Sequence, residues 1–146
     1  MVASKRFSGY QSAKVVVGTD PAANTEISQT VPAGELWLLY AVTVALVQGA
    51  TQTPLPVLSI TDGTTKFFES IGCTTAQAIN TTCQYNWATG LVTSGLIGAT
   101  TNVHAYAPLP EGLLLEAGYV IATTTVGIGA GSDYGAPAFF VLKGTA

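Results

Sequence analysis

The sequence predicts an all-β protein whose single domain is an antiparallel β-sandwich of eight to ten strands. Three observations predict this class. Short runs rich in β-branched and aromatic residues recur along the 146 residues, with Gly, Pro, Asn or Asp between them. No segment combines the 3.6-residue apolar period with the capping residues of an amphipathic helix. The chain is 48% hydrophobic and long enough to bury a core of its own.

An N-terminal arm is expected over residues 1–13, ahead of a sandwich domain over residues 14–146. The arm is small and polar apart from two aromatic residues, Phe7 and Tyr10, which are suited to anchor it on a neighbouring subunit. A frayed terminus accounts for the same composition equally well. Two short strands are predicted next, over residues 14–18 and 26–31, because both runs contain several β-branched residues.

The longest predicted strand covers residues 35–48 and follows a turn at residues 32–34. Its alternate residues form two faces, with Leu36, Leu38, Tyr40, Val42, Val44 and Leu46 on one and Trp37, Leu39, Ala41, Thr43, Ala45 and Val47 on the other. Both faces are apolar, so we expect the core to cover one of them and a second layer or a neighbouring subunit to cover the other. Fully extended, the strand would span roughly 45 Å, so we also expect a bend or a bulge.

A β-hairpin is predicted where two strand-like runs, residues 55–61 and 64–71, are joined by Asp62-Gly63. Residues 72–82 follow as a loop of small polar residues, and loops of this length are often functional or interfacial. Cys73 lies in this loop and Cys83 directly after it. The two cysteines could pair across the loop, but the sequence opens without a secretory signal, which favours free thiols.

Four further strands are predicted over residues 83–89, 103–109, 119–128 and 138–143, with a short apolar run at 113–115. Residues 90–102 are punctuated by glycine and fit no single element. Residues 129–137 are predicted to form a loop that exposes Tyr134. A turn that leads into a strand occurs twice, at residues 32–36 and 116–120, which favours a jelly-roll-like sandwich with paired halves.

Few residues are charged: five are basic and eight are acidic, 9% of the chain against about a quarter in an average protein. So few charges are typical of a subunit that contacts other copies rather than of a free monomer. The basic residues are scattered, so nucleic acid is not an expected partner. The longest apolar run is about twelve residues, too short for a membrane-spanning helix, so no membrane partner is expected.

No pattern in the sequence predicts an enzyme, a metal site or a cofactor. The only histidine, His104, falls in a predicted strand, and no His or Cys pair has the spacing of a zinc site. Five of the eight acidic residues fall in predicted turns, which accounts for the aspartates among them. A carbohydrate-binding module is the alternative, with Tyr85, Trp87 and Tyr134 as its sugar platform, although core packing is the simpler explanation of these aromatic residues.

Three pieces of the sequence resemble a known group of proteins. They are Val-Pro-Ala-Gly-Glu-Leu-Trp at 31–37, the hairpin at Asp62-Gly63, and Leu-Glu-Ala-Gly-Tyr-Val-Ile-Ala-Thr-Thr-Thr at 115–125 followed by Ala-Gly-Ser-Asp-Tyr-Gly-Ala-Pro at 130–137. Together they are similar to small all-β virion proteins of tailed bacteriophages. The resemblance implies a jelly roll without an active site or cofactor.

The resemblance also implies a role. Such jelly rolls decorate, or cement, the outer surface of the capsid, usually as homotrimers bound to the major capsid protein; related folds are head-fibre bases and tail components. We therefore expect a non-enzymatic virion protein, made in the host cytoplasm. The expected contacts with neighbouring subunits are residues 1–13 with Phe7 and Tyr10, the loop 72–82 with Cys73, the strand residues Trp37 and Tyr40, and Tyr134.

Overall fold

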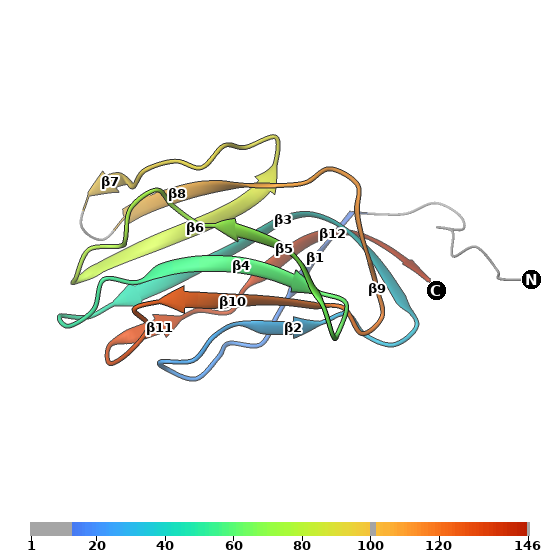
Figure 1. Ribbon diagram of the computed structural model, residues 1–146, viewed down its shortest axis with the longest axis horizontal. Coiled ribbons are helices and arrows are strands. Elements are labelled where there is room, and N and C mark those ends of the chain that lie inside the picture. The colour runs from blue at the N-terminus through green and yellow to red at the C-terminus, as the bar shows by residue number, and fades with distance from the viewer. Residues whose placement is uncertain (1–12, 100–101, 146) are drawn as a thin grey trace, which may run out of the picture.

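The computed structural model describes residues 13–99 and 102–145, and within them it contains twelve strands and no helix. The strands form two sheets stacked face to face (Figure 1). The predicted all-β sandwich is therefore confirmed, whereas the jelly-roll connectivity is not. The predicted arm, including Phe7 and Tyr10, lies outside the described residues except for Ala13, the first residue of strand β1.

The larger sheet has six strands in the order β1-β12-β3-β6-β8-β7, and two short strands, β9 and β11, also pair with β3. Their bounds are β1 Ala13–Val17, β12 Ala138–Thr145, β3 Glu35–Gln48, β6 Thr81–Thr89, β8 Asn102–Leu109, β7 Ile97–Ala99, β9 Leu113–Glu116 and β11 Ser132–Tyr134. The smaller sheet has the order β2-β10-β4-β5. Its strands are β2 Ser28–Thr30, β10 Val120–Val126, β4 Leu55–Thr61 and β5 Lys66–Ile71.

Two features of the sheets differ from the prediction. Strands β7 and β11 were not expected, and each is only three residues long, too short for alternation to reveal. Strands β6 and β8 pair in parallel, with Tyr85 opposite Ala105, although an antiparallel sandwich was predicted. The glycine-punctuated residues between these two strands form a crossover connection that lets β8 run in the same direction as β6.

The core lies between the two sheets. The larger sheet contributes five aromatic side chains, from Trp37, Tyr85, Trp87, Tyr134 and Phe139, and all are buried. The smaller sheet contributes aliphatic side chains, from Leu58, Ile60 and Ile121. Burying each of these large side chains stabilises the fold by about 1.5–3 kcal/mol relative to exposing it. The side of the larger sheet that faces the smaller one is called the inner face below.

Strand β3 contains the predicted irregularity, a β-bulge at Tyr40. Leu39 pairs with Val141 and Ala41 pairs with Phe140, so Tyr40 is an extra residue without a partner on β12. The bulge shifts the alternation by one residue. The predicted faces are therefore correct after Tyr40 but wrong before it, where Trp37 and Leu39, not Leu36 and Leu38, share the inner face with Val42 and Val44.

Candidate contact surfaces

The first question is whether metal-binding side chains lie together among the described residues. Within residues 13–99 and 102–145, no three His, Cys, Asp or Glu side chains are grouped so that they could hold a metal ion. His104 lies on β8, where its Nε2 is 3.2 Å from Oδ1 of Asn102. No helix in this part of the chain is long and apolar enough to cross a membrane. The features that remain to be explained are apolar side chains that the fold leaves exposed.

The first such feature is the outer face of the larger sheet, defined as the side turned away from the smaller sheet. Its central row crosses five strands, because the pairing register places apolar residues opposite one another: Val15, Phe140, Ala41, Ala88 and Pro108. Val15 and Phe140 are both exposed. In a sandwich whose outer faces are in contact with water, alternate residues facing outward are normally polar.

Two rows flank this central row, and a more polar row of Ala45, Gln84 and His104 follows toward the end of β3. One row contains Val17, Ala138, Thr43, Asn86 and Tyr106, and the other contains Ala13, Leu142, Leu38 and Leu114. None of the residues in these three rows is an acid or a base that is charged at neutral pH. The acidic residues on this side, Glu116 and Asp133, lie at opposite ends of β3, beside Leu36 and Val47. The outer face is therefore uncharged across its centre.

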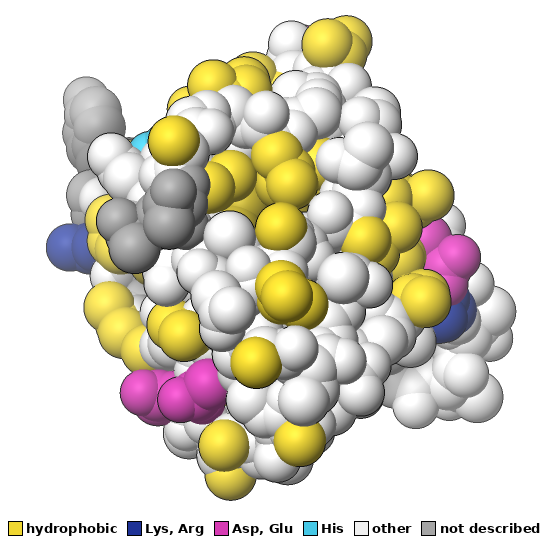
Figure 2. Space-filling view, turned by 90° about the vertical axis from the view of Figure 1, so that its left-hand side faces the viewer, with side chains coloured by type: hydrophobic (Ala, Val, Ile, Leu, Met, Phe, Trp, Pro, Cys, Tyr) yellow, Lys and Arg dark blue, Asp and Glu magenta, His cyan; other side chains and the backbone are white. Residues whose placement is uncertain are grey.

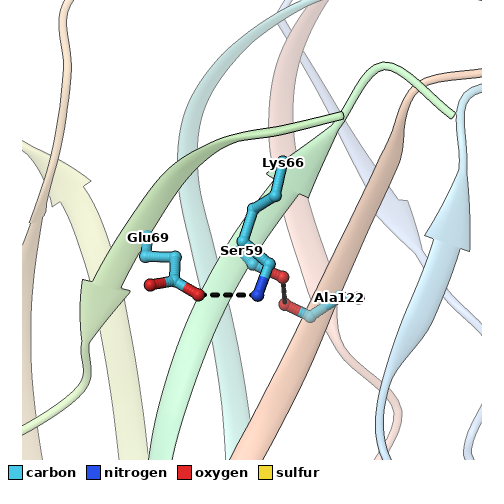
Figure 3. Close-up of polar contacts among 4 residues, drawn as sticks. All are labelled: Ser59, Lys66, Glu69 and Ala122. Carbon is cyan, nitrogen blue, oxygen red and sulfur yellow. Dashed lines mark hydrogen bonds and ion pairs between the residues drawn. The ribbon is translucent and has the colours of Figure 1, made fainter. Parts of the chain in front are cut away.

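The smaller sheet presents a different outer side. Lys66 and Glu69 form an ion pair on β5, with Nζ and Oε1 2.6 Å apart. In Figure 3 this pair lies beside Ser59 of β4, whose hydroxyl donates to the carbonyl of Ala122 at 3.5 Å. The outer side of the smaller sheet is mixed, because Phe67 and Ile71 of β5 are exposed beside this ion pair. Most of the large apolar side chains that are exposed on strands nevertheless belong to the larger sheet.

The second feature is one end of the sandwich, called the loop end and formed by residues 49–54, 72–80 and 127–131. Backbone hydrogen bonds connect these loops. The amide of Gly49 donates to the carbonyl of Gly131 at 2.9 Å, and the amide of Asn80 donates to the carbonyl of Gly49 at 2.9 Å. Thr51 Oγ1 donates to the carbonyl of Ala130 at 2.8 Å. The three loops therefore form one braced surface.

Gln77 anchors the predicted interfacial loop to the core through hydrogen bonds. Its side chain is fully buried, and Nε2 donates to the carbonyls of Leu46 at 2.8 Å and Thr81 at 3.0 Å. The Tyr85 hydroxyl donates to Gln77 Oε1 at 3.1 Å. Nothing in the sequence distinguished Gln77 from the other small polar residues around it. This glutamine gives the loop a fixed shape, which a surface that recognises a partner requires.

Apolar side chains are exposed at the loop end, notably Ile79 and, at the end of β10, Val126. Figure 2 views the molecule from this end and shows hydrophobic groups across the middle, with acidic and basic groups near the margins. The protein thus exposes apolar side chains on two surfaces, the loop end and the outer face.

Some of the predicted contact residues are exposed and others are buried. Tyr40 is 41% exposed and lies at the bulge beside the outer face. Trp37 and Cys73 are fully buried in the core, so their side chains offer no surface to a partner. The prediction that Tyr134 is exposed is wrong. Tyr134 pairs with Leu46 through β11, and its hydroxyl lies 2.6 Å from Oγ1 of Thr125 in the interior.

Of the two explanations given for Tyr85, Trp87 and Tyr134, core packing is confirmed and the sugar platform is not. Tyr85 and Trp87 stack on each other with ring centroids 5.9 Å apart, but both are fully buried, and the Trp87 indole donates to the Ser70 carbonyl. Burial raises the pKa of Tyr85 and of Tyr134, so both hydroxyls stay protonated at neutral pH. These three aromatic residues are core residues whose polar atoms have internal partners.

Both cysteines are free and buried, so the expectation of free thiols is confirmed. Burial raises the pKa of the Cys83 thiol to about 12, which leaves it unreactive at neutral pH. Comparison with protein-family models, with curated proteins and with solved structures finds no match. The features of the protein that bear on function are the resemblance in the sequence and the two apolar surfaces.

Proposed function

We propose that this chain is a non-enzymatic structural protein of a tailed-bacteriophage virion, which decorates the outer surface of the head as an oligomer bound to the major capsid protein. The observation that carries the proposal is the presence of two apolar surfaces, the outer face and the loop end. A protein that cements a shell needs two kinds of contact, one with other copies of itself and one with the shell. Assembly stabilises such a subunit because it covers apolar area that a monomer exposes to water.

The carboxylates support a structural role, because they act within the fold. Glu26 accepts hydrogen bonds from the hydroxyls of Thr123 and Thr125 at 2.6 and 2.8 Å and joins β10 to the segment before β2. Glu35 pairs with Lys143 at 2.7 Å. Asp62 accepts hydrogen bonds from two backbone amides of its own hairpin. These contacts give three of the eight carboxylates a place in the fold.

We assign the loop end to the shell. Its braced loops are rigid enough to fit a fixed partner, and residues 72–82 were expected from the sequence to contact the capsid lattice. The assignment leaves the outer face for contacts between copies of the decoration protein. Each bound copy then connects neighbouring capsid subunits and opposes the outward pressure of the packaged genome.

Co-sedimentation with capsids tests the proposal. Purified protein, mixed with expanded capsids that lack it, should sediment with them to saturation and should raise the temperature at which they break. Ile79→Lys, at the loop end, should weaken binding, because it places a charge in an apolar contact. Val92→Lys, in another exposed loop, is the control and should bind normally. Wild-type protein that stays in the supernatant, or that sediments with tails instead of heads, would refute the capsid role.

A further inference from the structure

We infer that the outer face of the larger sheet is the site where a second copy of this chain docks. This inference names the self-contact of the proposed decoration protein and so rests on that function. It depends on three observations: the extent of the open apolar rows, their lack of charge, and the edge at which they end. Each of these is a property of the three outward rows defined above.

The first observation is the size of the face. Five strands at about 4.8 Å spacing and rows covering about five residues of 3.4 Å give a projected area of roughly 400 Å². Apolar patches of this size on a soluble protein mark places where something binds. A stable contact buries on the order of 800 Å² on each partner, and the accessible area of a corrugated sheet exceeds its projection. The apolar rows therefore form the centre of a contact, and residues around them must complete its area.

The second observation is charge, which favours a copy of the same chain as the occupant. Two identical faces repel each other if they carry many charges of one sign, whereas the three central rows carry none. The other candidate occupant is the segment of residues 1–12, which directly precedes β1. Its sequence has Lys5 and Arg6 at the centre, and over the central rows these side chains would find no acidic partner. Packing against the same face of another copy buries no unpaired charge.

The third observation is the edge of the sheet. Strand β1 is the edge strand, and its outward side chains, Val15 and Val17, are exposed. The apolar rows therefore continue to the margin of the sheet instead of ending in polar residues. Pairing a strand of another copy with the β1 edge would leave Phe140 and Ala41 uncovered. Packing of one outer face on another covers them, and sandwich-like stacking of two sheets is a standard way to bury such rows.

The test compares lysine substitutions on the outer face with matched substitutions elsewhere in the full-length protein. Val17, 68% exposed on the outer face, is matched by Val126, 66% exposed at the end of β10. Phe140, 39% exposed on the outer face, is matched by Phe67, 47% exposed on β5 of the smaller sheet. Sedimentation velocity over a wide range of concentrations reports association, and circular dichroism confirms that each variant is folded.

Wild-type protein should associate in solution without capsids. Val17→Lys and Phe140→Lys should weaken association by about 100-fold or more, because each would bury an unpaired ammonium group. Val126→Lys and Phe67→Lys should associate as the wild type does. Folded outer-face variants that associate normally, or control variants that dissociate equally, would overturn the inference.

Two outcomes separate this inference from the proposed function and from the other occupant. Wild type that binds capsids but is monomeric at every concentration overturns the self-contact and leaves the capsid role in place. Wild type that self-associates through the outer face but ignores capsids supports the self-contact and refutes the capsid role. If the wild type is monomeric and Phe7→Lys with Tyr10→Lys makes it associate, residues 1–12 cover the face and the inference is overturned.

Discussion

Removing one buried hydroxyl, by Tyr85→Phe, should cost the fold about 1–3 kcal/mol of stability. The hydroxyl donates to Gln77 Oε1, and both side chains are fully buried, so no water replaces the lost donor. The ring and its stacking on Trp87 are retained, which limits the change to the hydrogen bond. Tyr134→Phe should cost less, about 0.5–1.5 kcal/mol, because Thr125 Oγ1 keeps its hydrogen bond to a glutamate.

Urea unfolding, followed by tryptophan fluorescence, measures the free energy of unfolding of each variant. The titrations should be repeated at several protein concentrations, since self-association would add a concentration-dependent contribution to the apparent stability. Tyr119→Phe is the matched control. Tyr119 is only partly buried, and its edge contact with Phe67 does not require the hydroxyl.

A loss of less than about 0.5 kcal/mol on Tyr85→Phe, no larger than in the Tyr119 control, would refute the reasoning. It would mean that Gln77 finds another donor, and hence that the loop end is not held rigidly in the way described. A loss in Tyr134→Phe that equals or exceeds the loss in Tyr85→Phe would also contradict it.

Three further predictions concern other parts of the core and one ion pair. Gly72→Ala should lower the stability measured by thermal unfolding by about 1–3 kcal/mol, because a methyl group there would lie 2.9 Å from two buried aromatic rings. Gly95→Ala is the control and should be nearly neutral, because the nearest atom to its methyl group would be 3.6 Å away. Cys73 and Cys83 should react with a thiol reagent at about pH 8 only after unfolding, because both are buried; fast labelling of the native protein would contradict this. Burial acts to raise the pKa of Glu35, but hydrogen bonds from its lysine partner and from an indole hold that pKa below its ordinary value. The contribution of the ionised Glu35 to stability is therefore present at neutral pH and is lost as the pH falls through the lowered pKa. Glu35→Gln should destabilise the protein by up to about 1 kcal/mol at neutral pH but not near pH 3. An equal loss of stability at the two pH values would contradict this reasoning.

The features predicted correctly from the sequence are those set by local chemistry. The hairpin at Asp62-Gly63 is an example, since Asp62 Oδ1 accepts the amides of Thr64 and Thr65 at 2.9 and 2.8 Å, within four residues of chain. The bulge in β3 was expected from strand length alone, although its position at Tyr40 was not. Glycine, aspartate and chain length specify such features without any reference to the rest of the fold.

The features that were missed depend on distant parts of the chain. Tyr134 lies in a stretch whose composition is that of an exposed loop, and it is buried because β11 happens to pair with β3. The parallel pairing of β6 with β8 is likewise a choice between partners that alternation does not encode. Gln77 was missed because a buried glutamine is recognised by its partners, and these come from β3 and β6.

The position of β12 between β1 and β3 also determines when the protein can fold. Val16 pairs with Phe139, and Phe139 pairs with Val42, so two early strands are held together only by a strand from the far end of the described sequence. Such long-range pairing is slow to form and leaves apolar strands exposed on a growing chain. The outer face receives Val15 from β1 and Phe140 from β12. While β12 is still inside the ribosome, the outer face is incomplete. Assembly through this face therefore cannot precede the release of β12 from the ribosome.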